Sequence, residues 1–383
     1  MQPSASPAPA PIRVLQLLVS TALGGGPKHV FDLVRRLPRD ELSAVVAAPA
    51  DGPFFERFES LGVEVVELPL NRLRPWTLAG VLRVVRERRV QIIHSHGKGA
   101  GLYGRLAGRW VGVPAVHTFH GIHHAKYPGG VRELYLRLER YLARLSEAVI
   151  HVSESQAREA QRLGLADPGR SHVVVNGIDA EEVRVLAEQL PLSRQALGLS
   201  REAQVLGCVA RFDEVKGLDL LVESLRRLAD RYPRLALVLV GSGKREGQLH
   251  KRVMRAGLAE RVQFAGPLAE PCRLFPLLDL YVSASRGEGL PYALLEAMAC
   301  GLAVVATRVT GHVDAVQDGV TGLLTRPEDP EDLAVSVARL LDDPELRRKL
   351  GRAGSERVES RFGLEPMVAQ LARLYRQAVA ARR

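Results

Sequence analysis

Short apolar segments alternate with helix-like segments along two successive stretches of this chain. In the first stretch, apolar runs at 12–19, 42–48 and 90–94 are each followed by a helix-like segment. Because parallel strands need crossover helices, this alternation predicts a parallel sheet with helices on both faces. The pattern restarts at about residue 204, beyond the turn signalled by Asn176 and the glycine after it. The sequence therefore predicts two Rossmann-like α/β domains that face each other across a cleft, where ligands normally bind.

The length of 383 residues also favours two domains over one. We assign residues 12–185 to an N-terminal domain, residues 186–361 to a C-terminal domain and residues 362–383 to a final helix. Residues 1–11 are rich in proline and alanine and lack the basic start of a secretion signal, so we expect a disordered tail. No apolar run is long enough to span a bilayer. Three cysteines without a CxxC spacing indicate a reduced, cytosolic protein.

Two glutamates, Glu288 and Glu296, frame the most informative polar stretch. Gly289 and Pro291 make its first half a loop, whereas residues 292–299 contain no helix breaker. One carboxylate is therefore predicted on a loop and the other inside the following helix, with backbone N–H groups of the helix N-terminus between them. Such N–H groups bind phosphate, and carboxylates accept hydrogen bonds from hydroxyls. The stretch fits a ligand that carries both groups, such as a nucleotide-sugar.

Two cations, Arg211 and Lys216, lie between an apolar strand and the start of a helix. Both could reach a phosphate there and stabilise the charge that grows on a diphosphate leaving group. An ordinary solvated loop explains this segment equally well.

Two glycine turns also follow predicted strands. Gly25 and Gly26 belong to a run of three glycines that would let backbone N–H groups approach an anion, although a merely flexible turn is the alternative. Gly241 and Gly243 resemble the start of a dinucleotide fingerprint, but Glu246 stands where its third glycine belongs. We interpret them as a tight turn that lines the donor side of the cleft.

Histidines gather between positions 94 and 124 without an acidic residue among them. No H-E-x-x-H pattern is present, so we expect no metal site. His120 is best placed to donate a hydrogen bond to a sugar or a diphosphate oxygen, because it follows a predicted strand. The alternative for each histidine is a satisfied polar group at a strand end. The histidines in question are His94, His96, His117, His120, His123 and His124.

Basic residues are concentrated between positions 72 and 109, where one acid, Glu87, accompanies nine of them. Such a face suits an anionic membrane or a polyanionic acceptor, and a solvated arginine-rich face is the alternative. Nucleic acid is not an expected partner, because aromatics make up only 5% of the chain and no recognition motif is present. The nine basic residues are Arg72, Arg74, Arg83, Arg86, Arg88, Arg89, Lys98, Arg105 and Arg109.

Taken in order, these motifs resemble those of the retaining glycosyltransferases of family 4, which have the GT-B fold. The resemblance covers about residues 12–373. It implies an α/β fold whose C-terminal helix returns towards the N-terminal domain. It also implies an enzyme that needs no metal or other cofactor and moves a sugar from a nucleotide-diphosphate-sugar to a glycan or lipid-linked acceptor. Bacterial cell-surface polysaccharide or lipopolysaccharide assembly, in the cytoplasm or at the inner face of the membrane, is the setting it implies. The motifs are at 24–26, 94–97, 117–121, 176–179, 211–217, 241–243 and 288–296.

The resemblance implies a donor-binding role for four neighbouring residues. Glu288 would bind hydroxyls of the donor sugar, and Glu296 would hold the ribose hydroxyls. Gly289 and Leu290 would offer backbone N–H groups to the donor.

The resemblance also assigns the phosphate contacts. Arg211 and Lys216 would bind the diphosphate and stabilise its departure. Gly25 and Gly26 would contact the distal phosphate and the acceptor side, and His120 would face the sugar ring.

The chain departs from the family pattern in two places. His312 and Asp314 replace a usual glycine and glutamate, and Ala210 stands where glycine is common. The first departure concerns the geometry of the donor-side loop. Two other functions stay open: a nucleotide-sugar epimerase of the same fold, and a non-catalytic component of a glycan assembly complex.

Overall fold

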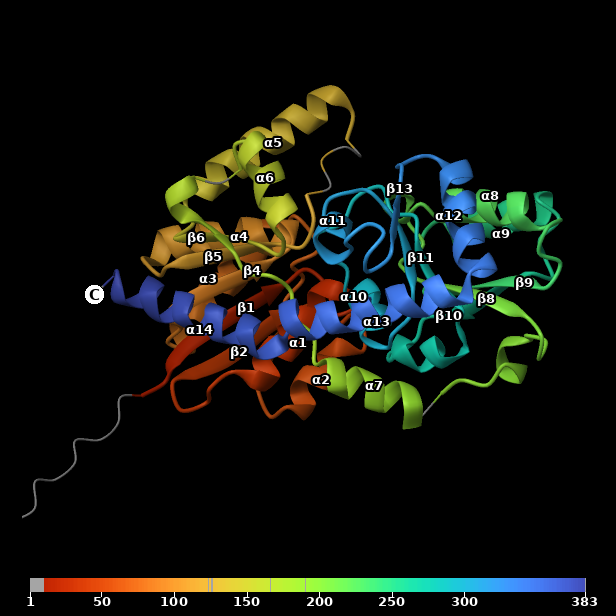
Figure 1. Ribbon diagram of the computed structural model, residues 1–383. Coiled ribbons are helices and arrows are strands. Elements are labelled where there is room, and N and C mark those ends of the chain that lie inside the picture. Colours follow the sequence, from red (N-terminus) through yellow and green to blue (C-terminus); the bar gives the residue numbers. More distant parts are fainter. Residues whose placement is uncertain (1–9, 123, 125–126, 166, 190, 383) are drawn as a thin grey trace, which may run out of the picture.

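The computed structural model describes residues 10–122, 124, 127–165, 167–189 and 191–382. Most of the predicted disordered tail and His123 lie outside these residues. The described chain forms two α/β domains (Figure 1). None of its helices is long and apolar enough to cross a membrane.

The N-terminal domain is a parallel sheet of seven strands with the order β3-β2-β1-β4-β5-β6-β7. Its central strands β4, β5 and β6 are buried along their whole length, as expected for a sheet covered on both faces. Its elements are β1 (Ile12–Leu18), α1 (Gly25–Arg36), β2 (Leu42–Ala48), α2 (Phe54–Ser60), β3 (Glu64–Glu67), α3 (Pro75–Glu87), β4 (Ile92–His96), α4 (Lys98–Val111), β5 (Ala115–Phe119), α5 (Gly129–Arg144), β6 (Ala148–His151), α6 (Glu154–Arg162), a 3-10 turn (Pro168–Arg170) and β7 (Ser171–Val173).

The C-terminal domain is a parallel sheet of six strands with the order β10-β9-β8-β11-β12-β13. Its elements are α7 (Ala180–Gln189), a 3-10 turn (Gln195–Leu197), β8 (Gln204–Val209), a 3-10 turn (Glu214–Lys216), α8 (Leu218–Leu228), β9 (Leu235–Val240), α9 (Glu246–Arg255), β10 (Val262–Gly266), a 3-10 helix (Pro271–Leu277), β11 (Leu280–Ser283), α10 (Tyr292–Ala299), β12 (Val304–Thr307), α11 (His312–Ala315), β13 (Leu323–Thr325), α12 (Pro330–Asp342) and α13 (Pro344–Arg361). A last helix, α14 (Leu364–Ala380), follows this domain.

The predicted domain boundary at residues 185 and 186 falls inside α7. Val183 and Ala187 of this helix are buried in the same hydrophobic cluster as Leu274 and Phe275, so α7 packs on the C-terminal domain. The boundary of the N-terminal sheet therefore lies before α7.

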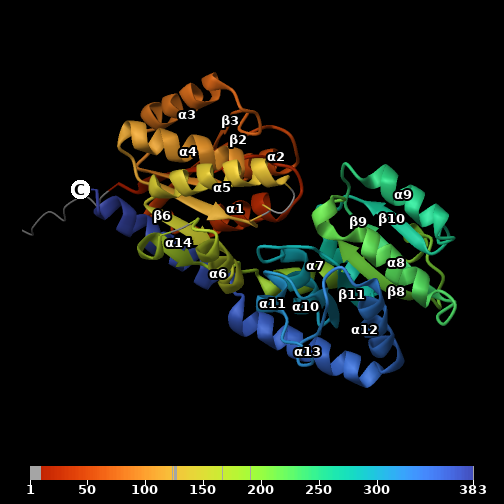
Figure 2. The same ribbon diagram turned by 90° about the horizontal axis from the view of Figure 1, so that it is seen from above.

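The last helix, α14, packs on the other domain. Leu371 and Tyr375 are fully buried in a cluster with Val14 and Ile92 of the N-terminal sheet. Figure 1 shows α14 leaving the end of α13 and running along the N-terminal domain. Figure 2 shows the two domains side by side, with α13 beneath one and α14 beneath the other.

The chain thus crosses between the domains twice, and the two crossings lie side by side. The N–H of Ile178 donates to the carbonyl of Phe362 (2.8 Å), and the N–H of Leu364 donates to the carbonyl of Ile178 (3.1 Å). Gly177 permits this approach, because a Cβ there would lie 2.1 Å from the Gly363 carbonyl oxygen.

The order of the strands in the two sheets indicates where a ligand site is expected. In each sheet the order reverses direction beside the first strand, between β1 and β4 and between β8 and β11. Ligands of open parallel sheets bind at the carboxyl ends of the strands at such a reversal. The glycine turn after β1, the loop after β8 and the loop after β11 all leave from these ends.

Candidate active site

A cavity of about 960 Å³ lies between the domains and is lined by residues of both. Ten of the eleven predicted site residues line it: Gly25, Gly26, His120, Arg211, Lys216, Gly241, Glu288, Gly289, Leu290 and Glu296. Gly243 is outside this lining. A Cβ at Gly243 would lie 2.6 Å from the Phe212 carbonyl oxygen, so this glycine serves the turn itself.

Lys216 and Glu288 form a largely buried ion pair in the wall of the cavity. The Lys216 ammonium is 2.6 and 2.8 Å from the two carboxylate oxygens of Glu288. The Ser285 hydroxyl donates to the same carboxylate (2.6 Å). Burial would raise the pKa of Glu288, but the Lys216 charge and the hydrogen bonds from Lys216 and Ser285 lower it to about 2. Glu288 is therefore an anion whose oxygens are ready to accept hydrogen bonds.

Arg211 is held differently from Lys216. Its side chain is 61% exposed and pairs with Asp213 at 3.0 Å. Both cations line the same cavity, so the structure brings the predicted pair together, with Lys216 mostly buried and Arg211 on the solvent side.

Glu296 is paired with a residue that the sequence analysis missed. The Lys28 ammonium on α1 lies 3.6 Å from the Glu296 carboxylate and 3.0 Å from that of Asp32. Burial and the neighbouring Asp32 raise the pKa of Glu296, although Lys28 opposes this shift. Because Lys28 and Glu296 belong to different domains, the pair also joins the two walls of the cavity.

The loop at Gly289 contacts the N-terminal domain through its backbone. Its carbonyl accepts from the Ser153 hydroxyl (2.8 Å), and the Leu290 carbonyl accepts from the Asn176 amide (2.9 Å). A Cβ at Gly289 would lie only 2.7 Å from the His120 carbonyl oxygen. Gly289 is therefore required for the two domains to meet this closely.

The glycine turns also face close neighbours. A Cβ at Gly25 would lie 3.3 Å from the Tyr292 ring, and one at Gly26 would lie 3.8 Å from the His120 ring. At Gly241, where φ is +133°, a Cβ would lie 1.9 Å from the Ala210 carbonyl oxygen, so only glycine fits.

The two residues of the first departure from the family pattern, His312 and Asp314, hold the donor-side loop. The buried His312 ring contacts the Thr307 carbonyl (2.8 Å) and the Ser283 hydroxyl (3.1 Å). Asp314 accepts hydrogen bonds from the N–H of Ser155 (3.0 Å) and from its hydroxyl, and Ser155 belongs to the other domain. These bonds fix the loop without the usual residues.

Three of the site histidines form a cluster: ligand atoms of His29, His96 and His120 lie within 4.8 Å of one another. Within the described residues, Nε2 of His29 is buried without a hydrogen-bond partner. Both nitrogens of His96 are engaged, however, because Nε2 contacts Gln16 (2.9 Å) and Nδ1 contacts His120 (3.0 Å). The donor set fits a hydrogen-bonded chain better than a metal centre, and the absence of a metal cofactor stays a prediction.

The predicted basic face is smaller than the charge count indicated. Arg105 is fully buried and paired with Glu139 at 2.8 Å, so it was wrongly assigned to the surface. Lys98 is half-buried and lines the cavity, with its ammonium 4.5 and 4.0 Å from the ring centres of Tyr127 and Tyr135. Burial lowers the pKa of Lys98 to about 8. Lys98 is therefore a cation of the cavity wall.

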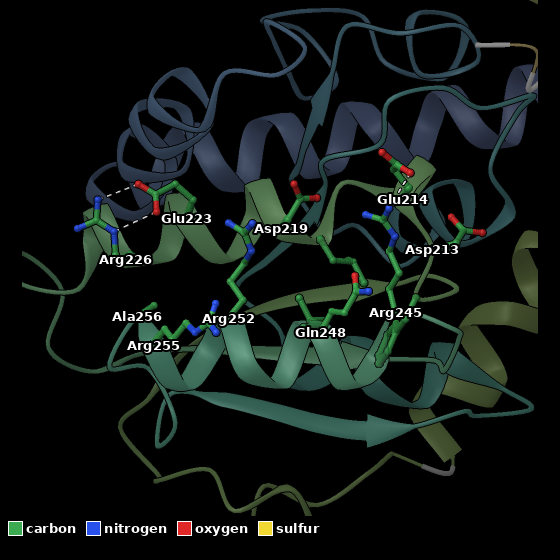
Figure 3. Close-up of a pocket in the computed structure, with 13 residues that line it drawn as sticks. Asp213, Glu214, Asp219, Glu223, Arg226, Arg245, Gln248, Arg252, Arg255 and Ala256 are labelled. Carbon is green, nitrogen blue, oxygen red and sulfur yellow. Dashed lines mark hydrogen bonds and ion pairs between the residues drawn. The ribbon is translucent and has the colours of Figure 1, made fainter. Parts of the chain in front are cut away.

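A second groove, of about 530 Å³, lies between α8 and α9 in the C-terminal domain (Figure 3). Two of its arginines pair with acids of the same groove: Arg226 with Glu223 and Arg245 with Glu214, each at 2.8 Å. Among the residues that the structure describes, none from the N-terminal domain lines this groove, so it lacks the convergent groups of the interdomain cavity.

Sequence comparisons agree with the two-domain division. The profile described as "Glycosyltransferase Family 4" matches residues 23–182, and that described as "Glycosyl transferases group 1" matches residues 191–357. A D-inositol 3-phosphate glycosyltransferase 2 of Catenulispora acidiphila is 33% identical and aligns over 75% of this chain and 71% of its own length. A D-inositol 3-phosphate glycosyltransferase of Salinispora arenicola is 31% identical over 99% of this chain and 95% of its own length. The crystal structure of HepE from Anabaena in complex with UDP-glucose matches 94% of this chain and 98% of its own, with a TM-score of 0.82 and 26% identity.

Proposed function

Because this chain belongs to the family 4 glycosyltransferases and has the GT-B fold, we propose that it transfers a sugar from a nucleoside diphosphate sugar with retention of configuration and without a metal cofactor. One observation carries the proposal. Arg211, Lys216, Glu288 and Glu296 line a single cavity between the two domains.

In the proposed reaction, Lys216 and Arg211 stabilise the negative charge that grows on the departing diphosphate. The donor phosphate competes with Glu288 for the Lys216 ammonium, which leaves carboxylate oxygens of Glu288 to accept from sugar hydroxyls. The departing phosphate itself accepts the proton of the acceptor hydroxyl. The acceptor attacks from the same face, so no side-chain base is required.

A UDP-sugar is the proposed donor. The support is the complex of HepE with UDP-glucose, which has the same fold at 26% identity. Glu296 is the proposed partner of the ribose hydroxyls, because its carboxylate lines the cavity on the first turns of α10.

A small phosphorylated polyol is the proposed acceptor. Relatives that align over most of the chain carry the name D-inositol 3-phosphate glycosyltransferase. Lys98, on the wall contributed by the N-terminal domain, is a cation suited to such a phosphate. A glycan or lipid-linked acceptor in cell-surface glycan assembly is the competing proposal.

The test is a turnover assay with UDP-, GDP- and ADP-sugars, each offered with D-inositol 3-phosphate or with a lipid-linked glycan. We expect nucleoside diphosphate release with a UDP-sugar and inositol phosphate, an unchanged rate in EDTA, and a product anomer identical to that of the donor. Interconversion of the sugar without any acceptor would indicate an epimerase instead. Calorimetry that detects no nucleotide binding would favour a non-catalytic protein.

One surface favours the competing, membrane-delivered acceptor. Four apolar side chains of α5 are between 43% and 69% exposed and share one face, because they are spaced by three and four residues: Val131, Leu134, Leu138 and Tyr141. Exposed Arg132 and Arg144 flank them. An apolar stripe beside arginines suits an anionic lipid surface, which would place the protein at the inner face of the membrane in the cytoplasm.

Sedimentation with phosphatidylcholine vesicles, with and without phosphatidylglycerol, tests this surface. The double variant Leu134→Glu/Leu138→Glu is expected to weaken binding to the anionic vesicles by about tenfold. Val335→Glu removes an equally exposed apolar side chain from α12 of the other domain and serves as the control. Equal binding of all three proteins would rule out α5 as the contact.

A further inference from the structure

A chain of buried polar side chains connects the C-terminal helix to His120. The hydroxyl of Tyr375, on α14, is 3.0 Å from Nε2 of Gln16 and 2.6 Å from Nδ1 of His94. Oε1 of Gln16 is 2.9 Å from Nε2 of His96, and Nδ1 of His96 is 3.0 Å from Nε2 of His120. Tyr375, Gln16 and His94 are all fully buried, so no solvent competes for these bonds.

The three histidines of this hydrogen-bonded chain are neutral. Burial, followed by the proximity of the other histidines, lowers the pKa of His94, His96 and His120 well below the ordinary value. Each ring therefore carries one proton, and its position is decided by the hydrogen bonds that the ring makes.

The amide of Gln16 gives the chain a direction. Its oxygen can only accept, so His96 must carry its proton on Nε2 and keep Nδ1 as a lone pair. His120 must then donate from Nε2 to His96. This leaves Nδ1 of His120 as a hydrogen-bond acceptor on a ring that lines the cavity.

The hydrogen bonds at the Tyr375 end of this series run in the same donor-to-acceptor direction. The Gln16 amide donates to the Tyr375 hydroxyl, and the hydroxyl proton goes to Nδ1 of His94. His94 then donates from Nε2 to the Thr118 hydroxyl, 2.7 Å away. Every bond of the chain has one donor and one acceptor.

We propose that Tyr375 is a positioning residue that keeps His120 protonated on Nε2, so that Nδ1 accepts a hydrogen bond from a substrate hydroxyl. The proposal rests on the proposed function only in taking His120 as a group that contacts substrate. The tyrosine hydroxyl matters because it accepts the Gln16 N–H. Without it, that N–H would be buried and unpaired, which costs more than an unpaired carbonyl. The amide would turn over, donate to His96 and reverse the chain, which places the His120 proton on Nδ1.

The test is 15N NMR of the histidine side chains, with the His120 signals assigned from the spectrum of a His120→Gln variant. We expect the Nε2–H form of His120 in the wild type and mainly the Nδ1–H form in Tyr375→Phe. The control is Tyr232→Phe, which removes a buried tyrosine hydroxyl bonded to Asp342 (2.7 Å) in the other domain. It is expected to leave His120 unchanged.

Kinetics provide the second readout. With donor and acceptor, Tyr375→Phe is expected to lower kcat/KM by about 10-fold, because only a minor fraction of His120 then presents an accepting Nδ1. Tyr232→Phe is expected to leave kcat/KM unchanged. The proposal would be overturned if His120 stayed in the Nε2–H form in Tyr375→Phe. A tautomer change without transferase activity in any protein would instead count against the proposed function. If Tyr375→Phe does not fold, Gln16→Leu breaks the same chain and is expected to shift His120 in the same direction.

Discussion

Replacing Lys216 with methionine is expected to lower kcat/KM by roughly 100- to 1,000-fold, the loss seen when one preorganised donor to a developing negative charge is removed. Lys216 is mostly buried and contacts both oxygens of Glu288, so its charge is fixed in the wall of the cavity before the donor binds. Steady-state kinetics with the true donor and acceptor measure this loss.

The same substitution is expected to lower the free energy of unfolding by about 3 kcal/mol, because it leaves the buried Glu288 carboxylate without its cation. The double variant Lys216→Met/Glu288→Gln should recover most of this stability and none of the activity, since the amide carries no charge. Lys244→Met, at an exposed position beyond the 241–243 turn, is the matched control. If the single variant kept wild-type turnover, Lys216 would not be the group that stabilises the leaving diphosphate.

Alanine at Gly289 is expected to reduce kcat/KM by about 100-fold, the effect of an ångström-scale misplacement in a site that depends on orientation. The new Cβ would lie 2.7 Å from the His120 carbonyl oxygen and 2.9 Å from the Val152 side chain, both in the opposite domain. The loop and His120 must therefore move apart, which separates the donor contacts from the site histidine.

Gly287→Ala is the control for this variant. It adds the same methyl group two residues earlier on the same loop, where no atom lies within 4 Å of the new Cβ. Both variants are measured by kcat/KM and by melting temperature. Equal activity in the two variants would mean that close contact between the domains at Gly289 is not needed for turnover.

The alternation of apolar strands and helices was sufficient to predict both domains, because a parallel sheet buried on both faces requires it. It was also sufficient to predict the sheet edges where the loops meet. Glu288 and Lys216 were predicted for one site, but their direct contact was not, since 72 residues separate them.

Other features of the site could not be predicted, because they depend on contacts between residues that are far apart in the sequence. Arg105 counts as a surface charge in the sequence because its partner, Glu139, is 34 residues away. Tyr375 is 359 residues from Gln16, and nothing in α14 marks it as part of a chain that ends at His120. Lys28 is different: it lies two residues after Gly26 of the glycine turn and four residues before Asp32, so its position in the cleft could have been predicted.

The hydrogen bonds between Ile178 and the segment at 362–364 have a consequence for domain motion. Two passages of backbone that are tied together must bend together, so they behave as one pivot instead of two independent tethers. We expect relative movement of the domains to be mainly rotation about a line near this pivot. Substrate binding then immobilises fewer degrees of freedom than in a pair of domains joined by one flexible strand, and less of the binding energy is consumed by ordering them.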